Sequence, residues 1–212
     1  NKLPEKYYDV LRASNLKDRE KLTRELFEAY PEHAEKAKKE TLKAVLGAKG
    51  LSKSIVDRRI KEELKGKNNW VLIGGPPCQA YSLVGRSRVG GIGKDDHRVY
   101  LYKEYLRIIA KHHPAVFVME NVKGLLSAEL DGEKIFDWIK RDLKVPGRIF
   151  RRHKSPEYNI YSFVTETIKN DRDFLIKAED YGIPQKRHRV ILLGVRSDIK
   201  QVPEALKIQH NK

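Results

Sequence analysis

Sulfur is scarce in this sequence, which has one cysteine, Cys78, and one methionine among its 212 residues. A lone cysteine cannot form an internal disulfide or a metal site built from several thiolates, and it suits a reducing cytoplasm. No run approaches the roughly 18 apolar residues that a membrane-spanning helix needs. The N-terminal residues also lack the apolar stretch of a secretory signal. These absences predict a cytoplasmic protein with no membrane partner and no bound metal.

Acidic residues are also in short supply, with 29 Asp and Glu against 44 Lys and Arg, which gives a net charge of +15. Such an excess attracts a polyanion such as nucleic acid, with an affinity that falls as salt rises. A solubilising surface on a Lys-rich protein would give the same balance. Charge alone therefore leaves both interpretations open.

The first 66 residues carry helical patterns and no recognisable chemistry. Residues 18–30 place apolar side chains at helical spacing, and Pro31 opens a second helix that runs to about residue 46. A serine can cap a third helix, which ends at Gly66. We expect residues 1–66 to form a helical segment packed on or inserted into the rest of the protein.

From residue 67 onward, short apolar strands alternate with helices. Helices are predicted near residues 99–111 and 132–143, and strands near residues 70–73, 115–119, 161–164, 174–178 and 190–195. This alternation predicts an α/β fold with a doubly wound, mostly parallel sheet. The sheet would span residues 67–200 and be followed by a tail, residues 201–212.

The first of three polar blocks, Gly74–Gln79, follows a predicted strand, and open α/β sheets bind ligands at such strand ends. Its two glycines let the backbone approach a ligand, and its two prolines hold the turn rigid. Cys78 is therefore placed like a nucleophile. The alternative is that Cys78 is a small apolar filler, as most free cysteines are.

The second block, Met119–Val122, puts Glu120 after an apolar strand, where an acid is either salt-bridged or functional. The third block, Gln185–Arg189, precedes the last predicted strand. Arginines at alternate positions of an extended segment point the same way and can converge on one ligand. Taken alone, this block is equally typical of a solvated run of charge.

In order, Pro-Pro-Cys-Gln, Glu-Asn-Val and Gln-x-Arg-x-Arg resemble the signature of cytosine-C5 DNA methyltransferases. Shorter matches support this resemblance at Ala80-Tyr81-Ser82, at Asp96, Arg98 and Leu101, and at Asp180–Pro184. The resemblance covers about residues 70–196. It implies the fold of S-adenosylmethionine-dependent methyltransferases, with S-adenosylmethionine and double-stranded DNA as partners and a place at the prokaryotic nucleoid.

The resemblance also implies roles in catalysis. Cys78 would add as a thiolate to C6 of the target cytosine. Glu120 would act as general acid and read the base edge. Arg189, with Arg187 beside it, would hold the base O2 and stabilise developing charge.

Other positions are implied to bind ligands. Six would contact the substrate base or DNA: Gln79, Ser82, Arg86, Arg88, Asn121 and Gln185. Three would contact the cofactor: Pro76, Pro77 and Leu101. A base inside a duplex must be flipped out to react, and residues 82–96, rich in glycine and basic residues, are expected to form a lid over it.

The sequence departs from the family pattern in three places. The strand followed by Phe-x-Gly-x-Gly, which shapes the family's cofactor pocket, is absent, and Trp70 stands where Asp is common. Few residues follow Arg189, so no target-recognition domain is expected within the chain. We therefore expect an interior fragment that needs the remainder of its own chain or a partner, and that does not methylate DNA alone.

Three other functions compete with this interpretation. An RNA cytosine-C5 methyltransferase, acting for example on tRNA, would share Cys78, Glu120 and Arg189. A non-catalytic DNA-binding fragment would lack the cofactor half. A thiol hydrolase lacks a persuasive base, because its candidate histidines show no triad pattern. Those histidines are His97, His112 and His113.

Overall fold

The computed structural model describes residues 3–42, 44–46, 53–77, 101–150 and 154–209. The chain divides into two compact units, Asn1–Val45 and Leu46–Lys212. This boundary lies well before residue 66, so the third of the predicted N-terminal helices belongs to the second unit. No helix within these ranges combines the length and the apolar character needed to cross a membrane.

The first unit contains three helices: α1 (Glu5–Arg12), α2 (Leu16–Ala29) and α3 (Pro31–Glu40). The side chain of Asn15 caps α2 by accepting a hydrogen bond from the backbone N–H of Asp18. α3 ends at Glu40 and not near residue 46, so the predicted end was wrong. Thr41 takes up an extended backbone, and its hydroxyl donates to the carbonyl of Ala37.

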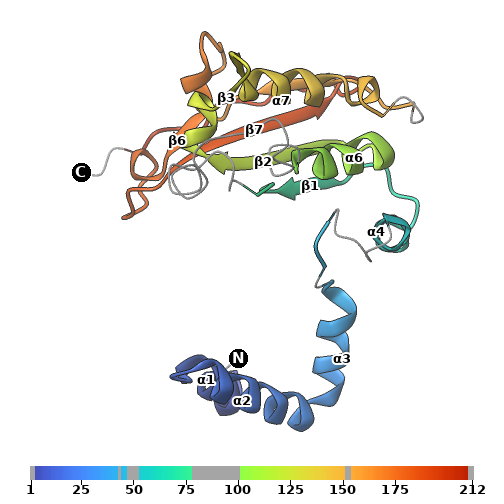
Figure 1. The fold of residues 1–212 in the computed structure, drawn as a ribbon, viewed down its shortest axis with the longest axis vertical. Coiled ribbons are helices and arrows are strands. Elements are labelled where there is room, and N and C mark those ends of the chain that lie inside the picture. The colour runs from blue at the N-terminus through green and yellow to red at the C-terminus, as the bar shows by residue number, and fades with distance from the viewer. Residues whose placement is uncertain (1–2, 43, 47–52, 78–100, 151–153, 210–212) are drawn as a thin grey trace. The chain divides into compact units, whose positions relative to one another are not determined.

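The second unit is built on a five-stranded sheet, shown in Figure 1. Its strands are β1 (Val71–Gly74), β2 (Val116–Val122), β5 (Tyr158–Tyr161), β6 (Leu175–Lys177) and β7 (His188–Arg196). The order is β1-β2-β7-β5, and β6 also pairs with β7. β1 runs parallel to β2, whereas β2, β5 and β6 all run antiparallel to β7.

The α/β class is therefore confirmed, but the described part of the sheet is mixed and not mostly parallel. The short connection between β6 and β7 explains one antiparallel pair. A parallel neighbour needs a crossover of about a dozen residues or more, usually with a helix, to return the chain to the starting edge. The segment 178–187 forms only a one-turn 3-10 helix and a turn, so the chain re-enters the sheet in the opposite direction.

The remaining elements connect and cover the strands. The helices are α4 (Lys53–Leu64), α6 (Tyr102–His112) and α7 (Ile135–Lys144), and the 3-10 turns are η2 (Lys123–Ser127), η3 (Pro146–Arg148), η4 (Asp171–Phe174) and η5 (Ala178–Asp180). β3 (Glu129–Leu130) and β4 (Glu133–Lys134) form a separate hairpin. Its two turn residues, Asp131 and Gly132, both have positive φ, as tight hairpin turns require.

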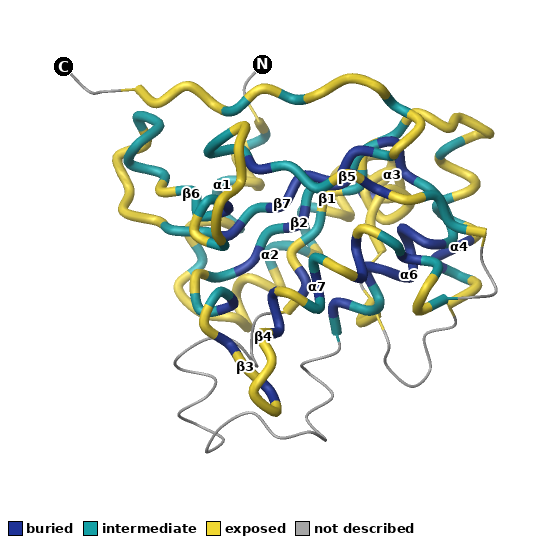
Figure 2. Tube along the Cα trace, turned by 90° about the horizontal axis from the view of Figure 1, so that it is seen from above, coloured by how far each residue is buried: buried dark blue, intermediate teal, exposed yellow. Residues whose placement is uncertain are grey.

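The hydrophobic core lies on the face of the sheet that α6 and α7 cover, and the buried segments of Figure 2 gather there. Tyr105 of α6 packs edge-to-face on Phe117 of β2, which in turn packs at a tilt on Tyr158 of β5, with ring centroids 6.2 Å and 5.2 Å apart. On the opposite face, Val71 and Ile73 of β1 are 55% and 76% exposed. The described helices therefore bury one face of the sheet at β1 and leave the other open.

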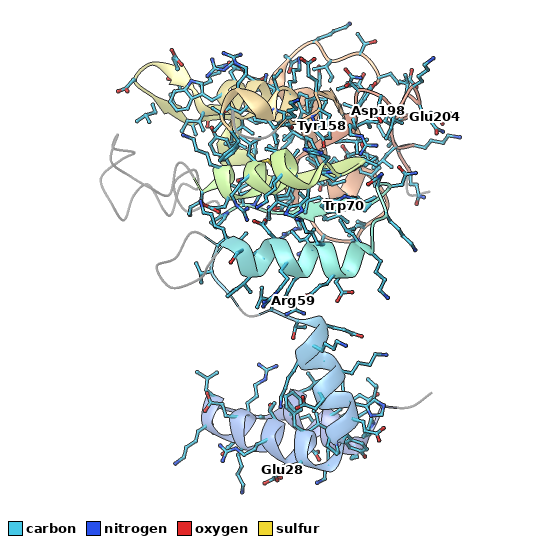
Figure 3. The ribbon with its side chains drawn as sticks, turned by 90° about the vertical axis from the view of Figure 1, so that its right-hand side faces the viewer. Glu28, Arg59, Trp70, Tyr158, Asp198 and Glu204 are labelled. Carbon is cyan, nitrogen blue, oxygen red and sulfur yellow. The ribbon has the colours of Figure 1, made fainter. Side chains whose placement is uncertain are left out.

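The turn from α6 into β2 is fixed by side chains from distant strands. The indole N–H of Trp70 donates to the carbonyl of His112 at 3.2 Å. The hydroxyl of Tyr158 donates to the carbonyl of Pro114 at 2.9 Å. Figure 3 labels both aromatic residues. These bonds fix the start of β2 beside the residue that precedes β1 and beside the first residue of β5.

Residues 201–209, the described part of the predicted tail, lie along the second unit. The backbone N–H of Leu206 donates to the carbonyl of Phe163 at 2.8 Å, and that of Gln209 donates to the carbonyl of Asp180 at 3.0 Å. The tail therefore runs past η5, close to the beginning of β7.

Gly194 of β7 is required by the ring of Phe117, which lies directly opposite on β2. A Cβ at Gly194 would overlap that ring, which is fully buried and cannot move aside. Overpacking of this kind costs about 1–3 kcal/mol. We expect Gly194→Ala to lower the free energy of unfolding in urea by at least about 1 kcal/mol. Exposed Ser197→Ala is the control, and equal stability of the two variants would contradict the packing argument.

A buried ion cluster docks α4 on α6. Asp57 of α4 is 5% exposed and contacts three groups of α6: Arg107 at 2.8 Å, Lys111 at 2.6 Å and His112 at 2.7 Å. Burial raises the pKa of Asp57, but these hydrogen bonds outweigh burial and hold that pKa well below its ordinary value. Burial also lowers the pKa of His112, by more than its bond to Asp57 raises it.

Both shifts predict a loss of stability in acid. A group whose pKa is lower in the folded state contributes stability that is lost as pH falls below its unfolded value. The loss should begin near pH 6.5, where His112 titrates when unfolded, and increase below about pH 4, where Asp57 does. We expect Asp57→Asn to lower the stability at pH 7 by about 3 kcal/mol and to flatten the decline below pH 4. Melting temperatures from pH 3 to 8 measure both, and an unchanged profile would contradict this assignment.

Candidate active site

β1 carries the chain to the edge of the sheet, where the first polar block begins. Gly75, Pro76 and Pro77 follow β1, and the structure describes all three. Cys78 comes next and lies outside the described residues, as does the predicted lid at residues 82–96. Four predicted ligand-binding residues also lie outside them: Gln79, Ser82, Arg86 and Arg88.

The sequence suggested that Glu120 follows the strand. Glu120 instead lies inside β2, which runs on to Val122. Likewise, β7 begins at His188 and includes Arg189. Glu120 pairs with Ile191 and Val122 pairs with Arg189, which makes Glu120 and Arg189 diagonal neighbours. Diagonal neighbours of an antiparallel pair are within reach of long side chains on the same face.

The two side chains meet on the face of the sheet away from α6 and α7. Alternation along β2 puts Glu120 on the face opposite the buried Phe117 and Met119. Arg189 Nε donates to Glu120 Oε1 at 2.7 Å, and an Nη of Arg187 lies 3.7 Å from the same oxygen. The second and third polar blocks therefore join in one carboxylate–guanidinium cluster.

The first block lies against the same carboxylate. A Cβ at Gly75 would lie 3.1 Å from Glu120 Oε2, so that a side chain there would push on the carboxylate. Gly75 is separated from Cys78 only by the two prolines. The turn that leads into Cys78 thus begins beside Glu120.

Asn121 fixes this turn to β2. Its side chain is 1% exposed, and its Nδ2 donates to the carbonyl of Pro76 at 3.2 Å while its Oδ1 accepts from the backbone N–H of Val122 at 2.9 Å. The amide therefore makes its hydrogen bonds within the protein, and the predicted contact of Asn121 with the substrate stays a prediction. The amide acts as a link between the ends of β1 and β2.

The other predicted ligand-binding residues differ in exposure. Pro76 is buried, Pro77 is exposed and Leu101, directly before α6, is half-buried. Gln185 is exposed, and its carbonyl accepts a hydrogen bond from the backbone N–H of Arg187 at 2.9 Å. Contacts of these residues with cofactor or substrate stay predictions.

Sequence patterns gave no sign of the histidine–carboxylate hydrogen bond beside the arginines. His188 Nε2 lies 2.6 Å from Glu179 Oε1, and the backbone carbonyl of His188 accepts from Arg189 Nη1 at 2.8 Å. The hydrogen bond from His188 is the main reason that the pKa of Glu179 lies below its ordinary value. The pair depends on the return of the chain from η5 into β7, which periodicity does not predict.

A groove of about 1360 Å³ opens next to Arg189. Besides Arg189, four cationic side chains line its walls: Lys123, Lys134, Arg172 and Lys177. Three carboxylates also line it: Glu129, Asp171 and Asp180. The other lining residues are Val122, Gly124, Leu126, Ser127, Val164, Asn170, Leu175 and His188. Within the described ranges, no group of three or more His, Cys, Asp and Glu side chains could hold a metal ion.

Proteins of known family resemble this chain over most of its length. A Type II methyltransferase of Bacillus paralicheniformis is 35% identical over 92% of this chain and 42% of its own. One of Lysinibacillus sphaericus is 34% identical over 72% and 29%. The crystal structure of a prophage-encoded E. coli protein, described as a DNA modification methyltransferase, is 25% identical over 75% and 36%, with a TM-score of 0.44.

The chain spans less than half the length of each of these proteins. The model of one family, the C-5 cytosine-specific DNA methylases, matches residues 28–212. This range includes part of the first unit, the whole of the second unit and all three polar blocks. The chain belongs to the C-5 cytosine-specific DNA methylase family.

Proposed function

We propose that this chain carries the cytosine-binding catalytic centre of a DNA cytosine-C5 methyltransferase. The observation that carries the proposal is the cluster of Glu120 and Arg189 beside the turn that leads into Cys78. Three segments far apart in the sequence carry the proposed nucleophile, acid and cation, and the acid and the cation are in contact. Family membership and the Type II methyltransferase relatives support DNA as the substrate.

Cys78 supplies the nucleophile. C5 of cytosine is a weak nucleophile, and addition of the thiolate to C6 gives C5 the character of an enamine carbon. C5 then takes up the methyl group, and loss of the C5 proton lets the thiolate leave. The rigid Pro76-Pro77 turn limits the directions from which the thiolate can approach.

Glu120 and Arg189 stabilise the charge that this addition creates. Glu120 holds N3 and the exocyclic amine of the base and donates a proton toward N3. Arg189 holds O2 and, through its bond to Glu120 Oε1, fixes the carboxylate for the base edge. Arg187, 3.7 Å from the same oxygen, adds positive charge.

The residues at the end of β1 fit part of a site for S-adenosylmethionine. The exposed side chains of Val71 and Ile73 offer apolar surface, and Gly75 keeps the adjoining backbone open. Pro77 and Leu101 would complete this side of the site. Bound S-adenosylmethionine supplies the methyl group.

Duplex DNA would reach the site from the groove beside Arg189. Lys123, Arg172 and Lys177 place positive charge along its walls, where phosphates of the strand that carries the flipped cytosine can bind. The net charge of +15 supports salt-sensitive binding of this kind.

Transfer of labelled methyl groups tests the proposal. The chain, or a longer polypeptide that contains it, is incubated with labelled S-adenosylmethionine and either duplex DNA or tRNA. Label at cytosine C5 of DNA alone supports the proposal, and label in tRNA alone contradicts it. If neither is labelled by the longest polypeptide and S-adenosylhomocysteine gives no thermal stabilisation, a non-catalytic DNA-binding function replaces it.

A further inference from the structure

We propose that Glu179 and His188 form a positioning pair that holds Arg189 against Glu120. The inference deepens the proposed function and rests on it for its role in catalysis. The geometry itself stands apart from that function. It consists of the hydrogen bond between the side chains of Glu179 and His188, and of the hydrogen bond from Arg189 to the backbone carbonyl of His188.

The pair joins two elements that meet at the edge of the groove. Glu179 lies in η5, and His188 is the first residue of β7, where it pairs with Lys177 of β6. Glu179 Oε1 lies 2.6 Å from His188 Nε2. The second oxygen, Oε2, is buried without a hydrogen-bond partner among the described residues. The Glu179 side chain as a whole is 33% exposed, so the bond to Oε1 restrains the imidazole at a site that is only partly enclosed.

The backbone carbonyl of His188 connects the restrained imidazole to Arg189. Arg189 Nη1 donates to the His188 carbonyl at 2.8 Å, while Arg189 Nε donates to Glu120 Oε1 at 2.7 Å. The guanidinium is therefore held at two points, one of which moves with His188. The backbone N–H of Ala178, the neighbour of Glu179, also donates to the carbonyl of Arg187 at 3.0 Å.

This arrangement removes freedom that a long side chain otherwise keeps. An arginine side chain has many rotamers. If most of them are excluded before the substrate binds, less conformational entropy is lost on binding. If the pair is broken, His188 keeps its pairing with Lys177 but is held less firmly, so the bond from Arg189 to its carbonyl is loosened. The base would then meet a guanidinium that samples several positions.

Solvent exchange of the Arg189 Nε–H, measured by ¹⁵N NMR on the full chain, tests the pair without any need for activity. The signal is assigned by its disappearance in Arg189→Lys. Glu179→Gln and His188→Phe should each speed exchange about tenfold, as expected when a charge-assisted hydrogen-bond network is loosened. His188→Gln keeps a side-chain N–H donor for Glu179 and should stay near the wild-type rate. Exposed Glu166→Gln is the matched control.

Exchange that stays at the wild-type rate in Glu179→Gln and His188→Phe would overturn the pair. So would equally fast exchange in His188→Gln and His188→Phe, because the hydrogen bond would then be irrelevant. In a polypeptide active on DNA, Glu179→Gln should lower kcat and leave the Kd for DNA unchanged. Fast exchange with unchanged kcat would keep the pair and reject the catalytic role of Arg189, which separates the two proposals.

Discussion

Replacement of Cys78 by alanine or serine should abolish the covalent complex with DNA that contains 5-fluorocytosine. After the thiolate has added to C6 and C5 has been methylated, release requires loss of a proton from C5. Fluorine at C5 cannot leave as a proton, so the thioether persists. Denaturing electrophoresis of a polypeptide that contains this chain, mixed with S-adenosylmethionine and the fluorinated duplex, displays the complex as a shifted band.

Cys78 is the only cysteine in the sequence, which makes this experiment unusually clear. No second thiol within the 212 residues can substitute for it. Ser197→Ala, an exposed position outside the site, is a control that should keep the complex. A shifted band of normal intensity in Cys78→Ala would remove the central claim about the nucleophile.

Replacement of Glu120 by glutamine should lower kcat about 10²- to 10⁴-fold, the usual contribution of a general acid or base. Glutamine keeps the shape of the side chain but cannot donate a carboxyl proton to the base. Arg189→Ala should lower kcat about 10²- to 10³-fold, as loss of one preorganised donor does. Initial rates of methyl transfer at saturating DNA measure both effects.

Because Arg189 fixes Glu120 through a 2.7 Å bond, the two effects should not add. The double variant is expected to be about as slow as Glu120→Gln alone. Arg187→Ala, whose guanidinium lies 3.7 Å from the carboxylate, should have the smallest effect of the three. Full additivity would show that Arg189 and Glu120 act independently and would contradict the cluster as a unit.

The order of motifs predicted that Glu120 and the arginines belong together, and the geometry explains why. The alternation of side chains in a strand puts Arg187 and Arg189 on one face, and pairing of β7 with β2 brings that face to Glu120. The spacing of apolar residues did not predict that β7 runs antiparallel to β2. Apolar strands of either direction look the same in sequence, because both faces of a central strand are buried.

Contacts between distant polar residues were also beyond sequence patterns. Asp57 meets three cationic or imidazole groups of α6, and Glu179 meets His188, but isolated charges in a chain so rich in them carry no signal. Asn121 was expected at the substrate because of its motif. Its burial shows that a motif residue can serve by holding the turn in place.

The position of β2 has a consequence for how the chain can be divided. This strand positions every described group of the site. Glu120 lies on it, Asn121 ties the turn before Cys78 to it, and Arg189 lies on the strand beside it. Their separations follow the spacing of about 4.8 Å between strands and not the lengths of the loops. New termini or a protease cut at the Asp131–Gly132 hairpin turn should therefore leave the site assembled, so that two polypeptides could share one active centre.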